Sequence, residues 1–480
     1  MSKTSDISDL NLVTFLGLLG SLMGILILNY QEVGLFSLTL PIGFTALWLI
    51  LPAISKAKLL FKRLSCWHAL WLCMILSGLV FRVRSTDTAN VSPLDPLALF
   101  RLGLIAVISL VLLYRLVFRE PDWLRSLFFG LPAPLTGYSL ICLLSAMWSF
   151  YPLWTLYKST EYLVDIALIT AIIGSVHTAR EFKTFFDWTW ILLGILIGSV
   201  WLGIVIWPEL AIIRNVGILG FSIRGVFPAF ETNGVGELGA ILGAVAFTRL
   251  LWVTEGKIFY FLILLIALVT LVCAQSRSPL TGFLLALPVI LFSSRRIGLL
   301  FLLPLLALAL IAFLSAPDHL EGFFLRGQRE EDFQSLSGRT NLWALGWEMF
   351  KERPLFGYGA YAGARFSGLA DTMGTGNSSI LNTWFEIVLG VGLAGGVLVL
   401  GAFLGLWTML TGFAWSARRG TLVHWLSVEA LGILTIVSVR SIFTVQIIWH
   451  PPVMFLLMLG FAEFIRRTYL RWPHENTFGA

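Results

Sequence analysis

The sequence predicts an all-α protein: a polytopic transmembrane helix bundle of about 12–14 spans, with one large extracytoplasmic loop containing a short amphipathic helix. Of its 480 residues, 58% are hydrophobic and 12% are charged, whereas a soluble domain carries about 25% charged residues. Apolar runs long enough for a helical span recur along most of the chain. One long polar stretch, residues 316–380, interrupts these runs. Lipid is therefore the expected main solvent.

Most of the apolar runs have the length of one transmembrane helix, about 20 residues. In chain order, the expected spans are 10–29, 34–54, 65–81, 96–117, 126–148, 154–176, 186–207, 233–254, 258–275, 279–294, 297–315, 380–412, 424–444 and 451–466. Two of these differ from the rest. The span 279–294 is short, so we expect it to be tilted or half-length. The span 380–412 is long and glycine-rich near its middle, so we expect it to begin as a short helix outside the bilayer.

Lys and Arg gather at alternate junctions between the spans. Pairs of arginines follow three later spans, at Arg295 and Arg296, Arg418 and Arg419, and Arg466 and Arg467. Basic residues are enriched in cytoplasmic loops of membrane proteins. These clusters fall on one side if both termini are cytoplasmic, which predicts that the polar stretch 316–380 lies outside.

This pattern divides the chain into four parts. Residues 1–125 form N-terminal transmembrane helices, 126–315 a transmembrane core with outward-facing arginines, 316–380 the large loop, and 381–480 the C-terminal helices with a short cytoplasmic tail. The four cysteines have no metal-ligand spacing, so neither a metal site nor a disulfide framework is expected. The sequence has no clustered basic face of the kind that binds nucleic acid.

The large loop contains a candidate amphipathic helix at about 339–352. Leu342, Leu345 and Met349 recur at helical spacing, and charged residues occupy the other face. Pro354 ends the helix, and the glycine-rich turn FGYGAYAG follows at 356–363. We expect this helix to lie on the membrane surface or to pack over the mouth of the bundle.

Ionisable side chains inside the expected spans are candidates for function. Lys158, Glu161 and Asp165 share one face of the span 154–176, and Asn233 and Glu237 lie one turn apart at the outer end of another. Such residues usually face the bundle interior or a wet cavity. A self-satisfied structural network is the alternative interpretation of the first group.

Several arginines map to the expected outer side, among them Arg224, Arg277 and Arg339. The planar guanidinium donates two parallel hydrogen bonds to phosphate oxygens. Arginines that converge on one cavity would suit a pyrophosphate, whereas a single arginine more often anchors a lipid headgroup.

Four patches of the sequence, covering about residues 130–410, resemble the bacterial O-antigen ligase and O-antigen or exopolysaccharide polymerase superfamily. They share a Ser/Trp segment before a span, an outward Arg-Gly-Phe element, a Ser-Arg pair, and a large loop with its returning span. These patches are LLSAMWSFYPLWTLYKSTEYL (143–163), RGVFPAFETNGVGELGAIL (224–242), CAQSRSPLTGFLLAL (273–287), and SGRTNLWALGWEMFKERPLFGYGAYAGARF (337–366) with NSSILNTWFEIVLGVGLAGG (377–396).

The resemblance implies a membrane glycosyltransferase of the GT-C class in the bacterial inner (plasma) membrane, with the large loop in the periplasm. The donor of this family is a glycan on undecaprenyl pyrophosphate, and no metal or other cofactor is needed. The acceptor would be a glycan or lipid A-core, and polysaccharide export machinery of the cell envelope is an expected partner. By the same resemblance, the pyrophosphate-binding residues are Arg224, Arg277 and Arg339. We expect Asn233, Lys158, Glu161 and Asn377 to support them.

The sequence departs from this family at the residue proposed to activate the acceptor. Ligases of the family commonly have a His just before the Asn of the returning segment, but here Gly376 precedes Asn377. We expect His450 or Glu237 to act as general base instead. His319, Glu231 and Asp371 are the remaining candidates on the outer side.

Polysaccharide polymerase and O-antigen ligase share fold and donor, and the sequence does not separate them. Two other classes of protein remain as alternatives: a solute or lipid transporter without covalent chemistry, and a scaffold subunit of an envelope polysaccharide assembly complex. A transporter would carry ionisable residues near the middle of the bilayer. The outward position of the arginines favours the enzyme.

Overall fold

The structure is a computed structural model, and the parts of the chain that it describes are residues 64–79, 96–118, 122–216, 219–254, 256–296, 298, 339–366 and 379–471. The expected spans 10–29, 34–54 and 297–315 lie outside these residues. Each of the other expected spans coincides with a helix. The fold class expected from the sequence, an all-α membrane bundle, is therefore confirmed.

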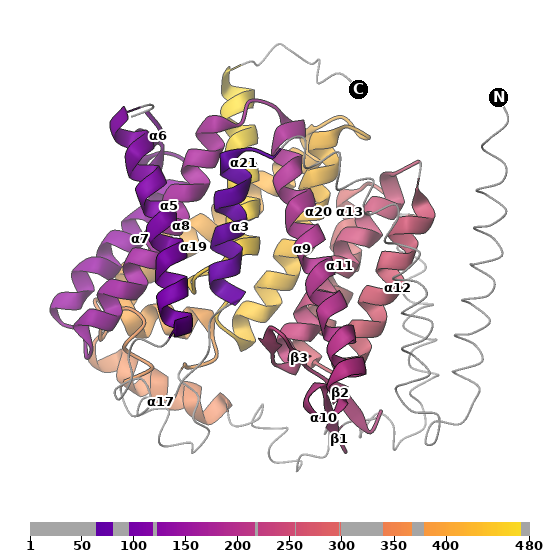
Figure 1. Cartoon of the computed structure of the whole chain (residues 1–480). Coiled ribbons are helices and arrows are strands. Elements are labelled where there is room, and N and C mark those ends of the chain that lie inside the picture. The colour runs from indigo at the N-terminus through magenta and orange to yellow at the C-terminus, as the bar shows by residue number, and fades with distance from the viewer. Residues whose placement is uncertain are drawn as a thin grey trace, which may run out of the picture. The chain divides into compact units, whose positions relative to one another are not determined.

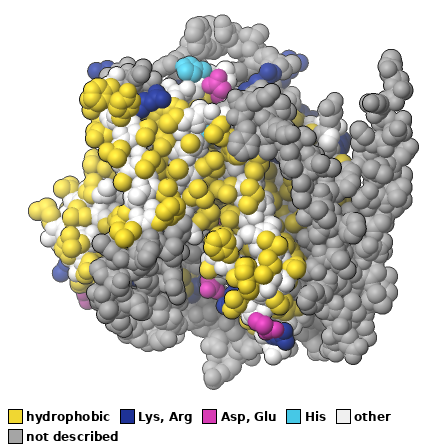
Figure 2. Space-filling view, in the orientation of Figure 1, with side chains coloured by type: hydrophobic (Ala, Val, Ile, Leu, Met, Phe, Trp, Pro, Cys, Tyr) yellow, Lys and Arg dark blue, Asp and Glu magenta, His cyan; other side chains and the backbone are white. Residues whose placement is uncertain are grey.

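Five described helices are long and apolar enough to cross a membrane. They are α5 (Pro96–Phe118), α9 (Ala179–Ile206), α11 (Thr232–Trp252), α19 (Thr383–Ser416) and α20 (Leu422–Phe443). The shorter apolar helices are α3 (Cys66–Leu79), α7 (Pro132–Leu144), α12 (Lys257–Cys273) and α13 (Arg277–Ser293). Hydrophobic side chains predominate on the described surface of the face that Figure 2 shows, as expected for a surface in contact with lipid.

Two further helices, α8 (Pro152–Ser175) and α21 (Val453–Arg471), carry ionisable residues among their apolar ones. The shortest elements are α6 (Asp122–Arg125), α10 (Pro208–Ala211) and the 3-10 turns η1 (Ser126–Phe128) and η2 (Ser145–Met147). The amphipathic helix expected in the large loop is present as α17, which runs from Arg339 to Glu352.

The described residues form two compact units, and the chain passes between them within α9 and within α13. The first unit contains Ile191–Leu280, with α10, α11 and α12. Gly239 of α11 lets that helix pack closely on α12, because a Cβ atom at this position would lie 2.8 Å from the carbonyl oxygen of Ala267. Small residues commonly permit such close approach between membrane helices.

Two short antiparallel hairpins in the first unit were not expected from the sequence. Strand β1 (Ile212–Arg214) pairs with β2 (Phe221–Ile223), and β3 (Gly225–Val226) pairs with β4 (Ala229–Phe230). Strands of two or three residues carry too little periodicity to be recognised. They connect α10 to α11 and carry Arg224 between β2 and β3.

The second unit contains Leu64–Trp190 and the described residues from Thr281 onward. Its helices α3, α5, α7, α8, α19, α20 and α21 run alongside one another, and α17 lies across the end of this group (Figure 1). Helix α8 packs against α3, α5, α7 and α21. Its side chains therefore face the interior of the unit in several directions. The four-part division expected from composition stays a prediction.

Helix α19 is broken where the sequence is richest in glycine. Val391 and Gly392 have non-helical backbone angles, with a φ of 66° at Gly392. The backbone groups released by this break bond to the loop after α17: Tyr358 N–H donates to Leu389 O, Gly359 N–H to Gly390 O, and Leu393 N–H to Pro354 O, each at 2.8 Å. Irregular backbone in a membrane bundle is tolerated where such partners are present. The loop and the broken part of α19 therefore supply each other's missing backbone hydrogen bonds.

Replacement of Gly392 by alanine should destabilise the second unit. Positive φ costs a residue with a Cβ about 1–3 kcal/mol, and the added Cβ would also overlap the backbone of Leu355. Gly412→Ala is the matched control, because a Cβ there meets no atom within 4 Å. Thermal unfolding of the purified variants in detergent should show a lower midpoint for Gly392→Ala alone. An unchanged midpoint would contradict the role given to the break.

Candidate functional site

The face of α8 that the sequence singled out is buried in the second unit. Lys158, Glu161 and Asp165 are 4%, 1% and 1% exposed. Burial of a charge in an apolar interior is very costly unless the charge is paired and hydrogen-bonded. The contacts of these three side chains therefore determine how α8 is held.

The carboxylate of Glu161 binds two cations through one oxygen. Its Oε2 accepts from Arg101 Nη2 of α5 at 2.7 Å and from Lys158 Nζ at 2.8 Å. The Lys158 ammonium also lies 4.8 Å from the ring centroid of Tyr157 and 5.3 Å from that of Trp154. Arg101 was not expected here, because one arginine near the start of an apolar run looks like an interfacial anchor.

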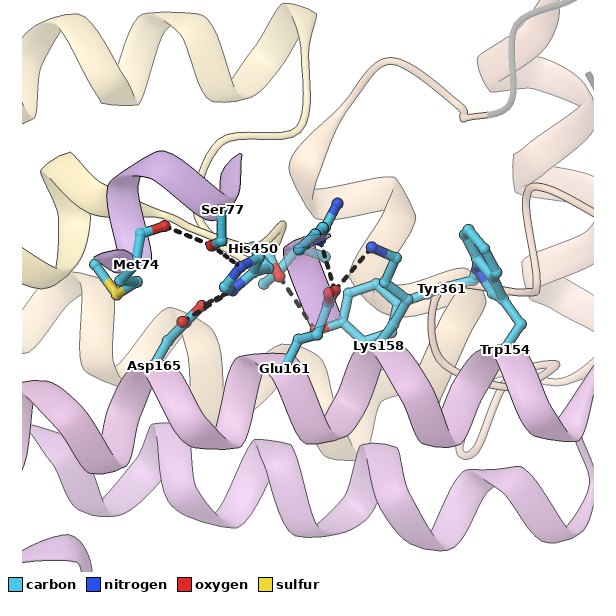
Figure 3. A network of polar contacts seen from close by, with 10 residues as sticks. Met74, Ser77, Trp154, Lys158, Glu161, Asp165, Tyr361 and His450 are labelled. Atoms are coloured by element: carbon cyan, nitrogen blue, oxygen red, sulfur yellow. Dashed lines mark hydrogen bonds and ion pairs between the residues drawn. The ribbon is translucent and has the colours of Figure 1, made fainter. Parts of the chain in front are cut away.

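A second polar chain begins one turn further along α8 (Figure 3). Asp165 Oδ2 lies 2.7 Å from His450 Nδ1, and His450 Nε2 lies 2.7 Å from Ser77 Oγ of α3. The His450 side chain is 1% exposed and that of Asp165 is fully buried. The Ser77 hydroxyl has one proton and two acceptors within reach, Nε2 and the Met74 carbonyl at 2.6 Å. Asp165 thus orients the imidazole, and Ser77 is the group through which Nε2 can exchange a proton.

His450 lies in residues 444–452, a non-helical segment between α20 and α21. Side chains from other elements satisfy its carbonyl groups: Tyr162 bonds Ile447 O at 3.3 Å and Tyr361 bonds Ile448 O at 3.1 Å. Thr383 donates to Thr444 O and accepts from Gln446 N–H. Such partners allow the chain to leave helical geometry inside the bundle.

The loop after α17 is attached to the start of α8. Thr155 Oγ1 donates to Ala360 O at 2.8 Å, and Trp154 Nε1 donates to Tyr361 O at 3.2 Å. Arg365 is buried, and its guanidinium lies 4.7 Å from the centroid of the Trp154 ring. Burial lowers the pKa of Arg365, and the nearby Glu386 carboxylate of α19 offsets part of this effect. Burial also raises the pKa of Tyr361 well above its usual value.

Arg339, at the first position of α17, is half-buried, and its guanidinium lies 5.9 Å from the ring centroid of Phe443. The same helix contributes Leu342 to a small core formed with Ala364, Ile380 and Leu389. The opposite side of α17 exposes Trp347. This packing holds Arg339 at the C-terminal end of α20, next to the segment that carries His450.

The first unit contains the other predicted site residues. Asn233, at the start of α11, accepts a 2.5 Å hydrogen bond from Ser276, the residue before Arg277. Arg224 uses its Nε to bond Leu210 O at 2.6 Å. Glu237 is half-buried one turn into α11. The start of α11 is thus adjacent to the start of α13. The sequence pattern did not reveal this. Arg224 and Arg277 belong to this unit and Arg339 to the second, so a shared pyrophosphate site stays a prediction.

Asn377, His319 and Asp371 lie outside the described residues. The asparagine that begins the returning helix is Asn382: its Oδ1 accepts from the backbone N–H groups of Trp384 at 2.9 Å and Phe385 at 3.1 Å and so caps α19. Leu381 precedes it. The histidine typical of ligases in the family is therefore absent before either asparagine.

Within the described ranges, no group of three or more His, Cys, Asp or Glu side chains could hold a metal ion. All four cysteines are described, and each is a free thiol. Independence of a metal stays a prediction about the reaction.

Comparison with known proteins gives one family match. Residues 262–400 match a family model described as O-antigen ligase. This region includes Arg277, Arg339, the broken part of α19 and the loop attached to it. The match confirms the resemblance to the O-antigen ligase and polymerase superfamily, and it supports transfer of a glycan from a lipid-linked donor to a glycan acceptor. No curated protein matches the sequence.

Loss of the Glu161 charge should lower the stability of the second unit by more than loss of an exposed charge does. Glu161→Gln would leave Arg101 and Lys158 without their shared carboxylate, and breaking a buried ion pair costs about 3–5 kcal/mol. Glu209→Gln is the control: its pair with Arg214 is exposed, and exposed pairs contribute little. Folded yield and the thermal unfolding midpoint measure both effects. Equal values for the two variants would show that the Glu161 pairing is not needed for stability.

Proposed function

We propose that this protein transfers an undecaprenyl-pyrophosphate-linked glycan to an acceptor hydroxyl on the periplasmic side of the bacterial inner membrane. It would act as an O-antigen or exopolysaccharide polymerase or as an O-antigen ligase, without a metal ion. The observation that carries the proposal is the O-antigen ligase match over residues 262–400. Polysaccharide export machinery is the expected neighbour of such an enzyme in the envelope.

The proposed reaction needs positive charge at the leaving group. The acceptor oxygen attacks the anomeric carbon, the bond from that carbon to the pyrophosphate oxygen breaks, and the electron pair stays on the pyrophosphate. We assign Arg224, Arg277 and Arg339 to this pyrophosphate, because preorganised cations placed where charge develops lower the barrier. Asn233, Lys158 and Glu161 support the site, and Asn377 is retained as a supporting residue from the sequence.

The reaction also needs a group that takes the proton of the acceptor hydroxyl. We assign this role to His450 or Glu237. For His450, the support is its hydrogen bond to Asp165, since a carboxylate on one ring nitrogen orients an imidazole and stabilises its protonated form. Ser77 would then pass the proton to Nε2, because it is the partner of that nitrogen.

The proposed orientation has both termini in the cytoplasm. Within the second unit, the difference between the two ends of α19 supports this orientation. One end is capped by Asn382 and packs against α17, and the other end is followed by Arg418 and Arg419. The basic end is assigned to the cytoplasm by the usual distribution of Lys and Arg. That assignment puts α17 in the periplasm.

Replacement of Arg224 or Arg339 by alanine should abolish glycan transfer without loss of the protein from the membrane. Removal of one group that stabilises developing negative charge costs about 10²–10³-fold in kcat. Arg214→Ala is the matched control for Arg224, because Arg214 lies in the same pair of hairpins but is exposed and paired with Glu209. The measurement is the amount of cell-surface glycan made by a deletion strain that carries each variant.

The same strain separates the candidate functions. Accumulation of single-repeat glycolipid would identify a polymerase, and accumulation of untransferred long chains would identify a ligase. Unchanged glycans in the deletion strain, or full activity of Arg224→Ala and Arg339→Ala at normal expression, would reject the enzyme proposal.

The proton acceptor can be tested in the same assay. If His450 is the base, His450→Gln should lower the rate by about 10²–10⁴-fold, and Glu237→Gln should have little effect; the reverse result would assign the role to Glu237. His177→Gln serves as control, because its side chain is 81% exposed. Wild-type rates for both variants would exclude both assignments.

A further inference from the structure

An apolar groove lies between α13 and α19 in the second unit. Its cavity volume is about 430 Å³, and Leu431 of α20 forms part of its lining. The other lining residues are largely apolar or aromatic, namely Pro288, Val289, Phe292, Trp407 and Trp415, together with Ser293 and Thr411. Helices α13 and α20 are in close contact beside it, since a Cβ at Gly432 would lie 2.7 Å from Ile290. The walls of the groove are therefore formed by helices that pack closely on one another.

Arg295 lies beside two aromatic residues that line this groove, Phe292 and Trp415. Phe292 and Trp415 are in edge contact, with ring centroids 5.2 Å apart. The guanidinium of Arg295 lies 5.6 Å from the Trp415 ring centroid. Its Nη2 donates to the carbonyls of Ala414, Trp415 and Ala417, at the C-terminal end of α19. Arg295 thus links the C-terminal ends of α13 and α19 beside the groove.

Further positive charge follows directly at the same end. Arg296 comes after Arg295, and Arg418 and Arg419 come after the last turn of α19. Arg295 and Arg419 both act electrostatically on His424, which lies near the start of α20. Arg418 and Arg419 are exposed, and neither is in an ion pair with an acidic residue of the described chain. The apolar groove is thus followed along α19 by two exposed arginines, Arg418 and Arg419, that no acidic side chain of the described residues pairs with.

We propose that this groove binds one acyl chain of an anionic membrane phospholipid, with the lipid headgroup at Arg418 and Arg419. The groove opens among exposed apolar side chains such as Phe292 and Trp415, so a hydrocarbon chain can enter it from the bilayer. Basic pockets between membrane helices on the cytoplasmic side are suited to anionic headgroups. The two arginines favour an anionic headgroup over a neutral one. Bulk lipid would instead fill the groove without preference for a headgroup. None of the residues that line the groove is assigned to glycan transfer, and the inference does not depend on that function.

Native mass spectrometry of the full-length protein in detergent tests the headgroup. The probes are dioleoyl phosphatidylglycerol, which is anionic, and dioleoyl phosphatidylcholine, which has the same chains and no net charge. We expect the anionic lipid to bind more tightly, by about fivefold for each arginine that contacts it, since one basic residue near an anionic lipid surface contributes about 1 kcal/mol. Arg418→Gln with Arg419→Gln should remove the preference, and Arg418→Lys with Arg419→Lys should keep most of it.

A second pair of variants tests the groove itself. Thr411→Trp would fill the groove and should weaken binding of both lipids. Thr408→Trp is the matched control, because Thr408 is also an exposed threonine of α19 but does not line the groove. The thermal unfolding midpoint of each variant without added lipid shows whether it is folded.

Equal binding of the two lipids by the wild-type protein would overturn the proposal, as would a preference that survives loss of both arginines. Wild-type lipid binding by folded Thr411→Trp would show that the lipid binds elsewhere. Loss of binding in Thr411→Trp but not in Thr408→Trp, together with loss of preference in the glutamine variant, would support it.

Discussion

The Glu161 carboxylate, shared between Arg101 and Lys158, is the interaction on which the second unit depends most. An apolar bundle cannot hold three charges on one helix unless each has a partner. The pairing with Arg101 joins α8 to α5. One turn away, Asp165 joins α8 to α3 and to residues 444–452 through His450 and Ser77. Polar contacts therefore fix the positions of elements that hydrophobic packing alone would hold in several arrangements.

The helices could be predicted from the sequence because each depends on a local property. A run of about 20 apolar residues is sufficient for a span, and the periodicity of Leu342, Leu345 and Met349 was sufficient for α17. The glycines near 390 led us to expect a short separate helix at the start of this long span, and α19 is indeed broken at Val391 and Gly392; whether the first part lies outside the bilayer stays a prediction. The two hairpins could not be predicted, because their short strands are defined by bonds such as those of the Gln275 side chain to Val216 and Phe221, which lie far away in sequence.

The candidate site was only partly predictable for the same reason. The spacing of Lys158, Glu161 and Asp165 identified the polar face of α8, but no spacing identifies Arg101 or Ser77 as their partners. Ser77 lies 373 positions from His450, and a single serine in an apolar span is a common residue without a pattern of its own. The capping role of Asn382 was missed because the family resemblance pointed to Asn377, and only backbone geometry distinguishes a cap.

The backbone hydrogen bonds between α19 and residues 354–359 also determine how this part of the protein can move. If the loop withdrew, carbonyls such as those of Leu389 and Gly390 would lose their donors, and each unsatisfied backbone group away from water costs several kcal/mol. The loop therefore cannot open as a free lid. A displacement of α17 would have to carry the N-terminal half of α19 with it and bend the helix at Gly392. That glycine would then act as a hinge within α19, between the N-terminal half that packs on α17 and the C-terminal half that leads to Arg418.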